Sequence, residues 1–347
     1  MRARVFVLGS GCSAMLFVGA ACSSFGTTPA EEGVDASSEV APPTDGGKPL
    51  CSPVSPPPET PHVCVGACTA KKLFPGQAAE QSVVSGSTIY IVTQKTLQVN
   101  PHVNAGAFTQ LVPGLSIKGI PTKMAVDDAY VYVSTDEEHV RVPRAGGLKE
   151  ALPLLDGDRS PVFLGTSVFY QLKPTHVIRS PKNGSDGGLS LTVVATRSLA
   201  VDGDEAYWIG LNSATEPVIF GPFPTLTEHA AVKESLGFVV KDGLAYVAEP
   251  SATGPGGVIS RIVLRDGTRA PLVNEPGTIE SLYFQDGTLY WVARRSLADG
   301  SRVLASVDPC GGASKVLVTD LAAISALSFN EKNAYATAGG AVYSMRR

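Results

Sequence analysis

Charged residues and tryptophan are both scarce in this chain of 347 residues. Charged residues make up 17% of the sequence, and two residues are tryptophan. The net charge of −4 comes without a run of lysine or arginine that could follow a phosphate backbone. Removing residues 1–21, which hold two arginines and no acidic residue, changes the net charge to −6. We therefore expect no nucleic acid partner.

Sequence signatures of catalysis are missing as well. The chain has neither the Gly-x-Ser-x-Gly elbow of hydrolases nor the His-Glu-x-x-His pair of zinc proteases. The glycine-rich run 254–257 falls inside an expected hairpin, not between a strand and a helix, which argues against nucleotide binding. These observations predict a protein that is not an enzyme and holds no metal or cofactor. The alternative is a lyase or lactonase with a metal in a central channel. Asp202, Asn274 and Glu280 are the candidate site residues for this enzyme, but the sequence gives no sign that they lie close together.

A single long apolar run begins at Val5, behind two arginines, and it is too short to span a membrane. It ends in Ala20-Ala21-Cys22, which resembles the processing site of bacterial lipoproteins, where the cysteine becomes a lipidated N-terminus. We predict a signal peptide over 1–21 and lipidation of Cys22, with ordinary signal cleavage as the alternative. By the same resemblance, Ser23 in place of aspartate implies the outer membrane, on its periplasmic or cell-surface side. The lipid anchor is then the expected membrane contact.

Residues 22–62 contain almost no large apolar side chains, and they are rich in proline, serine and threonine. Such a composition cannot bury enough apolar surface to fold. We predict a disordered tether, partly extended through its prolines, that holds a folded domain over 63–347 away from the membrane.

Four cysteines remain after Cys22: Cys51, Cys64, Cys68 and Cys310. An even number in an exported protein favours two disulfides over a metal site. Three pairings are possible, and we favour Cys68–Cys310 with Cys51–Cys64. The reason is that Cys310 lies beside the unit of the fold that the N-terminal segment is expected to complete.

An aromatic residue recurs along the domain at intervals of 42, 37, 38, 39, 44 and 45 residues. Each aromatic follows a tight-turn signal and lies in a segment rich in β-branched residues, which is typical of a buried strand. A period near forty with several strands in each unit is typical of a β-propeller with one blade per repeat. The seven residues, which we expect to be core, are Tyr90, Tyr132, Phe169, Tyr207, Tyr246, Tyr290 and Tyr335.

The last unit, 324–347, has room for three strands only. The segment Lys71-Lys72-Leu73-Phe74 resembles the missing outer strand, and its pairing with 341–345 would close the ring and remove an open sheet edge. We therefore predict an all-β, seven-bladed β-propeller, with six or eight blades as alternatives because the pattern is weak around Pro222 and Pro224.

Propellers bind through loops at one end of their ring, and the expected loops in units four to six are longer than in units one to three. The residues that we assign to this binding face are Trp208, Glu216, Glu249, Arg294, Arg295 and Asp299. The Tyr207-Trp208 and Tyr290-Trp291 pairs resemble the YWTD/TolB-like propellers, and the whole chain resembles the lipoproteins of myxobacteria-like Gram-negative bacteria. The resemblance implies a monomeric binding scaffold for an envelope protein or a glycan.

Overall fold

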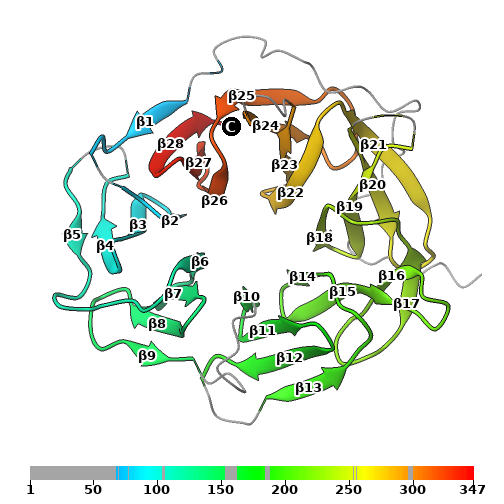
Figure 1. Ribbon diagram of the computed structural model, residues 1–347, viewed down its shortest axis with the longest axis horizontal. Coiled ribbons are helices and arrows are strands. Elements are labelled where there is room, and N and C mark those ends of the chain that lie inside the picture. Colours follow the sequence, from blue (N-terminus) through cyan, green and yellow to red (C-terminus); the bar gives the residue numbers. More distant parts are fainter. Residues whose placement is uncertain are drawn as a thin grey trace, which may run out of the picture. The chain divides into compact units, whose positions relative to one another are not determined.

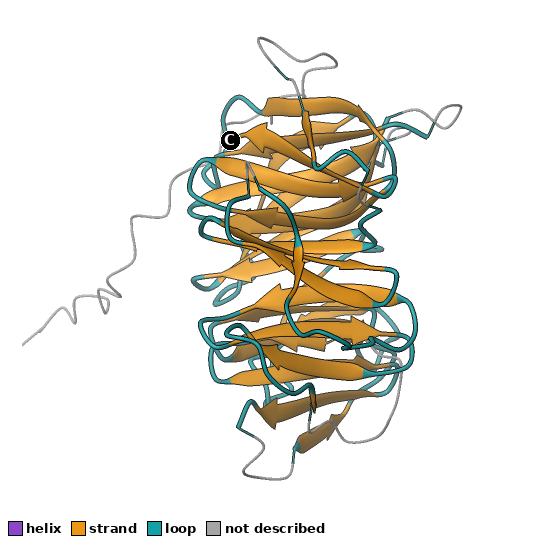
Figure 2. Ribbon diagram, turned by 90° about the vertical axis from the view of Figure 1, so that its left-hand side faces the viewer, coloured by secondary structure: helices purple, strands orange, loops and turns teal. Residues whose placement is uncertain are grey.

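The computed structural model describes residues 68, 70–76, 78–103, 106–152, 162–183, 188–252, 254, 256–295 and 300–347. The predicted signal peptide and tether lie outside these residues, as do Cys22, Cys51, Cys64 and Asp299. The described residues form strands, turns and loops without a helix, and no helix among them could cross a membrane. Figure 2 shows the strands from the side of the ring.

Seven antiparallel sheets of four strands surround a common axis, which confirms the seven-bladed β-propeller (Figure 1). In each of the first six blades, the strands follow one another in sequence from the axis outward. The strands of blades one to three are β2 (Gln81–Ser85), β3 (Thr88–Thr93), β4 (Thr96–Asn100), β5 (Thr109–Gln110); β6 (Pro121–Val126), β7 (Tyr130–Thr135), β8 (His139–Pro143), β9 (Glu150–Ala151); β10 (Val162–Leu164), β11 (Val168–Lys173), β12 (His176–Pro181) and β13 (Leu189–Thr192).

Blades four to seven repeat the arrangement. Their strands are β14 (Ser198–Asp202), β15 (Glu205–Leu211), β16 (Pro217–Phe220), β17 (Glu228–Ala231); β18 (Gly237–Lys241), β19 (Leu244–Pro250), β20 (Gly257–Val263), β21 (Arg269–Glu275); β22 (Thr278–Gln285), β23 (Thr288–Arg294), β24 (Arg302–Val307), β25 (Lys315–Leu321); β26 (Ile324–Phe329), β27 (Asn333–Ala338) and β28 (Ala341–Arg346). Blade four keeps its four strands because Pro222 and Pro224 lie in the turn between β16 and β17 and not within a strand, although the register of these two strands shifts between Ile219 and Phe220.

Strand β1 (Lys71–Leu73) completes blade seven. It pairs antiparallel with β28, with Lys71 opposite Ser344 and Leu73 opposite Val342. Leu73 is buried, while the two lysines are exposed. The predicted closure by the N-terminal segment is therefore confirmed, and it leaves no blade with a missing outer strand.

The core lies between neighbouring blades. The seven repeated aromatic residues are all buried, with exposed fractions of 7% or less, as the repeat predicted. Tyr246 packs in one cluster with Leu282 and Trp291 of the following blade, and Tyr90 packs with Met124 and Val131 of blade two. Because the same position is buried in every unit, its aromatic character serves packing.

Candidate functional site: two unlike faces of the ring

The propeller has two faces that differ in their connections. The second-to-third strand loops and the links between blades lie on one side, which we call the loop face, and the other hairpin turns lie on the opposite turn face. On the loop face, the second-to-third strand loop spans two or three residues in blades one to three. In blades four to six it spans 212–216, 251–256 and 295–301, and we call these three loops the platform. The predicted difference in loop length is thus confirmed.

The blade-four loop is held by its own side chain. Asn212 Oδ1 accepts hydrogen bonds from the backbone N–H groups of Ala214 and Glu216, each at 3.0 Å. The N–H of Thr215 donates to the carbonyl oxygen of Asn212 at 3.0 Å, with Thr215 at a positive φ of 65°. The side chain of Glu216 is left exposed to solvent on this fixed loop.

Glu249 fixes the base of the blade-five loop. Its carboxylate, which is 5% exposed, accepts a hydrogen bond from Arg269 Nη1 at 2.9 Å and another from the N–H of Lys233 at 2.6 Å. Arg269 also donates to the carbonyl oxygen of Ala231 in blade four. Glu249 therefore ties the link between blades four and five to the outer strand of blade five.

Glu275, at the end of β21, is the most enclosed charge of the platform. Its side chain is fully buried, and four donor atoms surround it: Gly277 N at 3.0 Å, Trp291 Nε1 at 2.9 Å, and Arg295 Nε at 2.8 Å and Nη2 at 3.2 Å. A buried carboxylate is tolerated when it is paired and its lone pairs are satisfied. Glu275 joins blade five to both the core and the loop of blade six.

The backbone of the blade-five loop approaches the same region closely. Gly256 has a φ of +128°, and a Cβ atom at this position would lie 2.5 Å from the carbonyl oxygen of Glu275. A side chain would displace the loop, so glycine is required there.

The ends of the blade-six loop converge on a second carboxylate. Glu280, on the innermost strand of blade six, lies 3.1 Å from Arg302 Nε and 3.7 Å from Arg294 Nε. Arg302 also donates to the carbonyl oxygen of Gly300 within the loop. Both ends of the 295–301 loop are thereby anchored to the inner strand.

The structure separates the predicted binding residues into different roles. Trp208 is fully buried and stacks on Phe220 at 5.9 Å, so it does not reach the loop face. Glu249 and Arg295 are internal ties, Arg294 is half-buried beside Glu280, and Glu216 is exposed. The sequence analysis did not identify Glu275 or Arg269 as functional residues. Glu275 could have been found from its position in a turn signal, Asn274-Glu275-Pro276-Gly277.

The turn face has a different kind of contact, which crosses from one blade to the preceding blade. The residue just after the third strand is basic in blades two and three, and Arg347 holds the same position in blade seven. Arg144 Nε donates to the Tyr90 hydroxyl at 3.0 Å, and Arg347 Nε donates to the Tyr290 hydroxyl at 2.7 Å. Lys182 lies over the Tyr132 ring, 5.4 Å from its centroid. We call these three contacts the latches.

The latch of blades two and three includes an acid. Asp127 accepts hydrogen bonds from Lys182 Nζ at 2.9 Å and from the Tyr132 hydroxyl at 2.7 Å. Desolvation raises the pKa of Asp127, but the hydrogen bonds from Lys182, Tyr132 and the backbone outweigh it and bring the pKa to about 2. Burial, and then the contact with Asp127, raises the pKa of Tyr132. The group is thus an ionised carboxylate between two donors.

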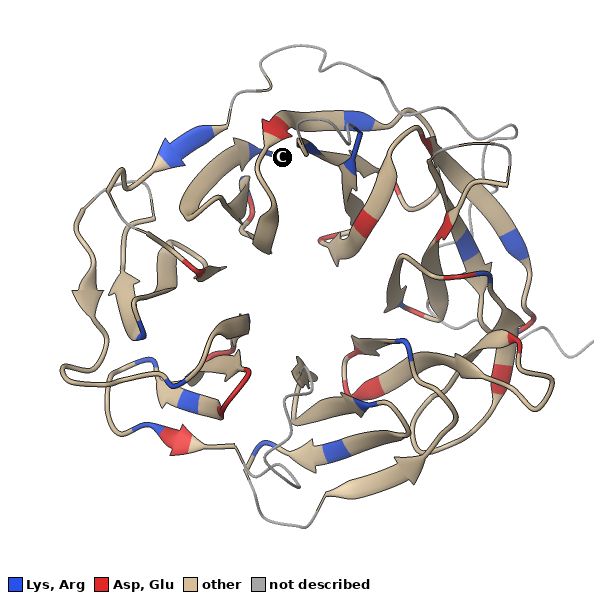
Figure 3. Ribbon diagram, in the orientation of Figure 1, with Lys and Arg blue, Asp and Glu red and all other residues tan. Residues whose placement is uncertain are grey.

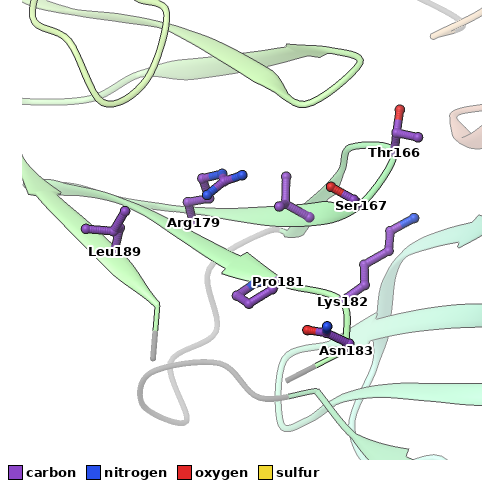
Figure 4. Close-up of a pocket in the computed structure, with 8 residues that line it drawn as sticks. Thr166, Ser167, Arg179, Pro181, Lys182, Asn183 and Leu189 are labelled. Carbon is purple, nitrogen blue, oxygen red and sulfur yellow. The ribbon is translucent and has the colours of Figure 1, made fainter. Parts of the chain in front are cut away.

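A hollow of about 570 Å³ opens on the turn face of blade three (Figure 4). Two of its polar side chains already have partners: Ser167 Oγ donates to Asp204 at 2.5 Å, and Lys182 is held by Asp127. This hollow does not coincide with the predicted binding face. Its lining residues are Thr166, Ser167, Val168, Arg179, Pro181, Lys182, Asn183 and Leu189.

The three candidates for a channel enzyme do not come together. Asp202 ends β14 on the turn face and pairs with Lys241 at 2.8 Å, whereas Glu280 lies toward the loop face with its two arginines. Asn274 lies on β21, an outer strand. Among the described residues, no group of three or more His, Cys, Asp or Glu side chains could hold a metal ion. Basic and acidic residues are interspersed among the described blades (Figure 3).

These observations define a seven-bladed β-propeller with one braced and one latched face. Neither a protein-family model nor a curated protein matches the chain in sequence. The chain is similar in structure to the Neurospora crassa Pan2 WD40 domain, with 10% identity over 83% of this chain and 97% of that one and a TM-score of 0.56. It is also similar to Kuenenia stuttgartiensis hydrazine synthase, with 13% identity, 78% and 96% coverage and a TM-score of 0.55.

A computationally designed protein, Ika8, is similar to the same degree, with 11% identity over 78% of this chain and 96% of that one and a TM-score of 0.54. A WD40 domain, a hydrazine synthase and a designed protein share an architecture and no common role by these descriptions. The likeness therefore confirms the propeller fold and carries no function to this chain.

Proposed function

We propose that the protein is an exported, lipid-anchored β-propeller that acts as a non-enzymatic scaffold. In this proposal, the platform binds an envelope protein or a glycan. The observation that carries it is the bracing of the platform: three long loops are held by Asn212, Glu249, Glu275 and Glu280. A loop whose ends are held loses less conformational entropy when it binds than a loop with free ends, which favours affinity.

The anchoring part of the proposal rests on the sequence alone. The basic N-terminus, the short apolar run and Ala20-Ala21-Cys22 support lipidation at Cys22 and export to the outer membrane. Metabolic labelling with a fatty acid tests it, because labelling should occur in the parent chain and be lost in Cys22→Ala. Equal labelling of both proteins, or of neither, would contradict the anchor without affecting the binding proposal.

We also propose the disulfides Cys68–Cys310 and Cys51–Cys64. Cys68 Sγ lies 3.3 Å from the carbonyl oxygen of Val316 in β25, and Cys310 lies in the turn that leads into the same strand. Cross-linking residues so distant in sequence would restrict the unfolded chain strongly. Peptide mapping under non-reducing conditions should recover the 68–310 linked peptide, and recovery of Cys68 linked to Cys51 or Cys64 would contradict the pairing.

Binding is tested by crosslinking in intact cells followed by mass spectrometry, together with a glycan array. The platform variant combines Glu216→Lys with replacement of residues 296–299 by Gly-Ser-Gly-Ser, which keeps Arg294, Arg295 and Arg302. The matched control carries Leu148→Ser and Leu226→Ser, two exposed residues of the turn face.

We expect a crosslinked protein or a glycan signal that the platform variant loses and the control retains. Loss in the control with retention in the platform variant would move the binding surface to the turn face. The absence of any specific protein or glycan bound by the parent chain would contradict the scaffold.

A further inference from the structure

His229 has a carbonyl oxygen beside each of its two ring nitrogens. It lies on β17, the outermost strand of blade four (Figure 1). Nε2 lies 2.7 Å from the carbonyl oxygen of Gly221, in the turn between β16 and β17. Nδ1 lies 2.8 Å from the carbonyl oxygen of Leu264, in the turn that follows β20 of blade five. The imidazole is half-buried, 6.0 Å from the Tyr207 ring between centroids, and it joins blade four to blade five.

The backbone of β17 places this side chain between the two blades. Ile219 of β16 pairs with Ala230, and the adjacent Phe220 pairs with Glu228. His229 therefore lies at a register shift, with no residue opposite it in β16. An extra residue of this kind bends its strand and changes the direction of its side chain. The shift is thus the local feature that allows the ring to reach both turns.

The two contacts determine which form of the ring fits the site. Both partners are carbonyl oxygens, which accept hydrogen bonds and cannot donate them. Each ring nitrogen must therefore carry a proton if both contacts are hydrogen bonds. A neutral imidazole has a proton on one nitrogen only, whereas the imidazolium has one on each. In the neutral ring, one nitrogen directs a lone pair at a carbonyl oxygen, so that hydrogen bond is lost.

We propose that His229 is a proton-sensitive clamp between blades four and five. The imidazolium donates to both carbonyl oxygens, and loss of a proton between about pH 5 and pH 8 removes one of the two bonds. The clamp therefore stabilises the fold on the acid side of this range and contributes less as the pH rises. It acts on the turn face and is independent of partner binding at the platform.

The ionisable neighbours of His229 do not titrate over the same range. Neither β16 nor the turn 221–227 contains an ionisable residue. Burial raises the pKa of Tyr207, so its hydroxyl stays neutral. Carboxyl groups ordinarily titrate below pH 5 and lysine and arginine above pH 10, which leaves histidine as the group that changes charge between them. The charged side chains on the neighbouring elements are Glu205, Glu228, Arg265, Asp266, the group Asp202, Lys241 and Asp242, and the pair Arg269 and Glu249.

Urea unfolding of the full chain at pH 5.5 and pH 8.0 tests the clamp. The unfolding equilibrium constant of the parent should rise between these pH values by at least about fivefold more than that of His229→Gln. Glutamine is neutral at both pH values, so its contacts do not change with pH. His102→Gln is the matched control, because His102 is exposed, and it should keep the pH dependence of the parent. Equal pH dependence in the parent and His229→Gln would contradict the clamp.

A second measurement detects the ring protons in the parent chain. With ¹⁵N-labelled histidine, NMR should show two slowly exchanging ring N–H signals for His229 at pH 5.5 and one at pH 8.0. Through-space contacts with the Tyr207 ring assign these signals without a variant. Exposed His102 should show no slowly exchanging ring proton at either pH. The same number of His229 signals at both pH values would overturn the proposal, because the ring would then serve packing only.

Discussion

The contacts between neighbouring blades differ between two parts of the ring, blades four to six and blades one to three. On the loop face of blades four to six, buried carboxylates bind arginines and backbone N–H groups at the roots of long loops. In blades one to three these loops are short, and two latches join these blades on the turn face, as a third does between blades six and seven. The short loop of blade two has a similar tie, because Glu138 binds Lys149 Nζ at 2.9 Å and the N–H of Lys118 at 2.7 Å. The difference is that Glu249 and Glu275, beside the long loops, are more deeply buried than Glu138.

The two tryptophans make the contrast sharper. Trp208 and Trp291 follow the repeated tyrosine in blades four and six, and both are fully buried. Trp291 Nε1 donates to Glu275, whereas no acceptor for Trp208 Nε1 is found in the described chain. Equivalent positions in the repeat therefore share packing and differ in polar contacts, even between two blades that both carry long loops.

The largest expected effect comes from removing the carboxylate of Glu275. Glu275→Ala leaves Arg295 and Trp291 without their acceptor, and breaking a buried pair in this way costs about 3–5 kcal/mol of unfolding free energy. Urea unfolding measures the loss. Glu216→Ala is the control and should change stability by less than about 0.5 kcal/mol, because its side chain is exposed. Equal losses in the two variants would refute the bracing role.

The next effect compares the tryptophans directly. Trp291→Phe and Trp208→Phe remove similar buried volume, but the first also removes a hydrogen bond to a charged group. Such bonds are worth about 1.5–3 kcal/mol, so Trp291→Phe should cost more by roughly that amount. Chemical denaturation of both variants provides the comparison, and a greater cost for Trp208→Phe would contradict the assigned hydrogen bond.

A smaller effect is expected at the latches. Tyr90→Phe removes the acceptor of Arg144 Nε and should cost about 1 kcal/mol. Tyr246→Phe is the matched control, since no hydrogen bond to the Tyr246 hydroxyl is found within the described chain. Thermal unfolding should lower the Tm of the first variant and leave the second nearly unchanged. Equal changes in Tm for Tyr90→Phe and Tyr246→Phe would show that the latch does not stabilise the fold.

The last prediction is a dependence of stability on acid. The pKa of Asp127 is about 2 in the folded protein, below the 3.8 of the free group, so its contribution is present above pH 4 and is lost as the pH falls toward 2. Asp127→Asn should therefore reduce the loss of stability between pH 4 and pH 2, as followed by the urea midpoint. An unchanged acid dependence would show that other carboxylates account for it.

The repeated aromatics and the missing seventh outer strand were readable from the sequence because both concern packing, which repeats with the blade. Trp208 was misplaced because a strand between two blades is buried on both sides, so alternation does not tell which residue faces solvent. The pairing of Glu249 with Arg269, and of Glu275 with Trp291, depends on distances between strands that residue spacing does not encode.

Ring closure by β1 also has a consequence for the order of folding. Lys71 pairs with Ser344 within blade seven, and Ser82 Oγ of blade one lies 2.7 Å from Thr337 Oγ1 of blade seven, so the contacts that close the ring join residues more than 250 positions apart. Such distant contacts form slowly. During synthesis, blades one to six can assemble as each segment emerges, whereas β1 stays unpaired until β28 has been made. The last pairing of blade seven therefore depends on three residues that lie far from their partner strand in sequence.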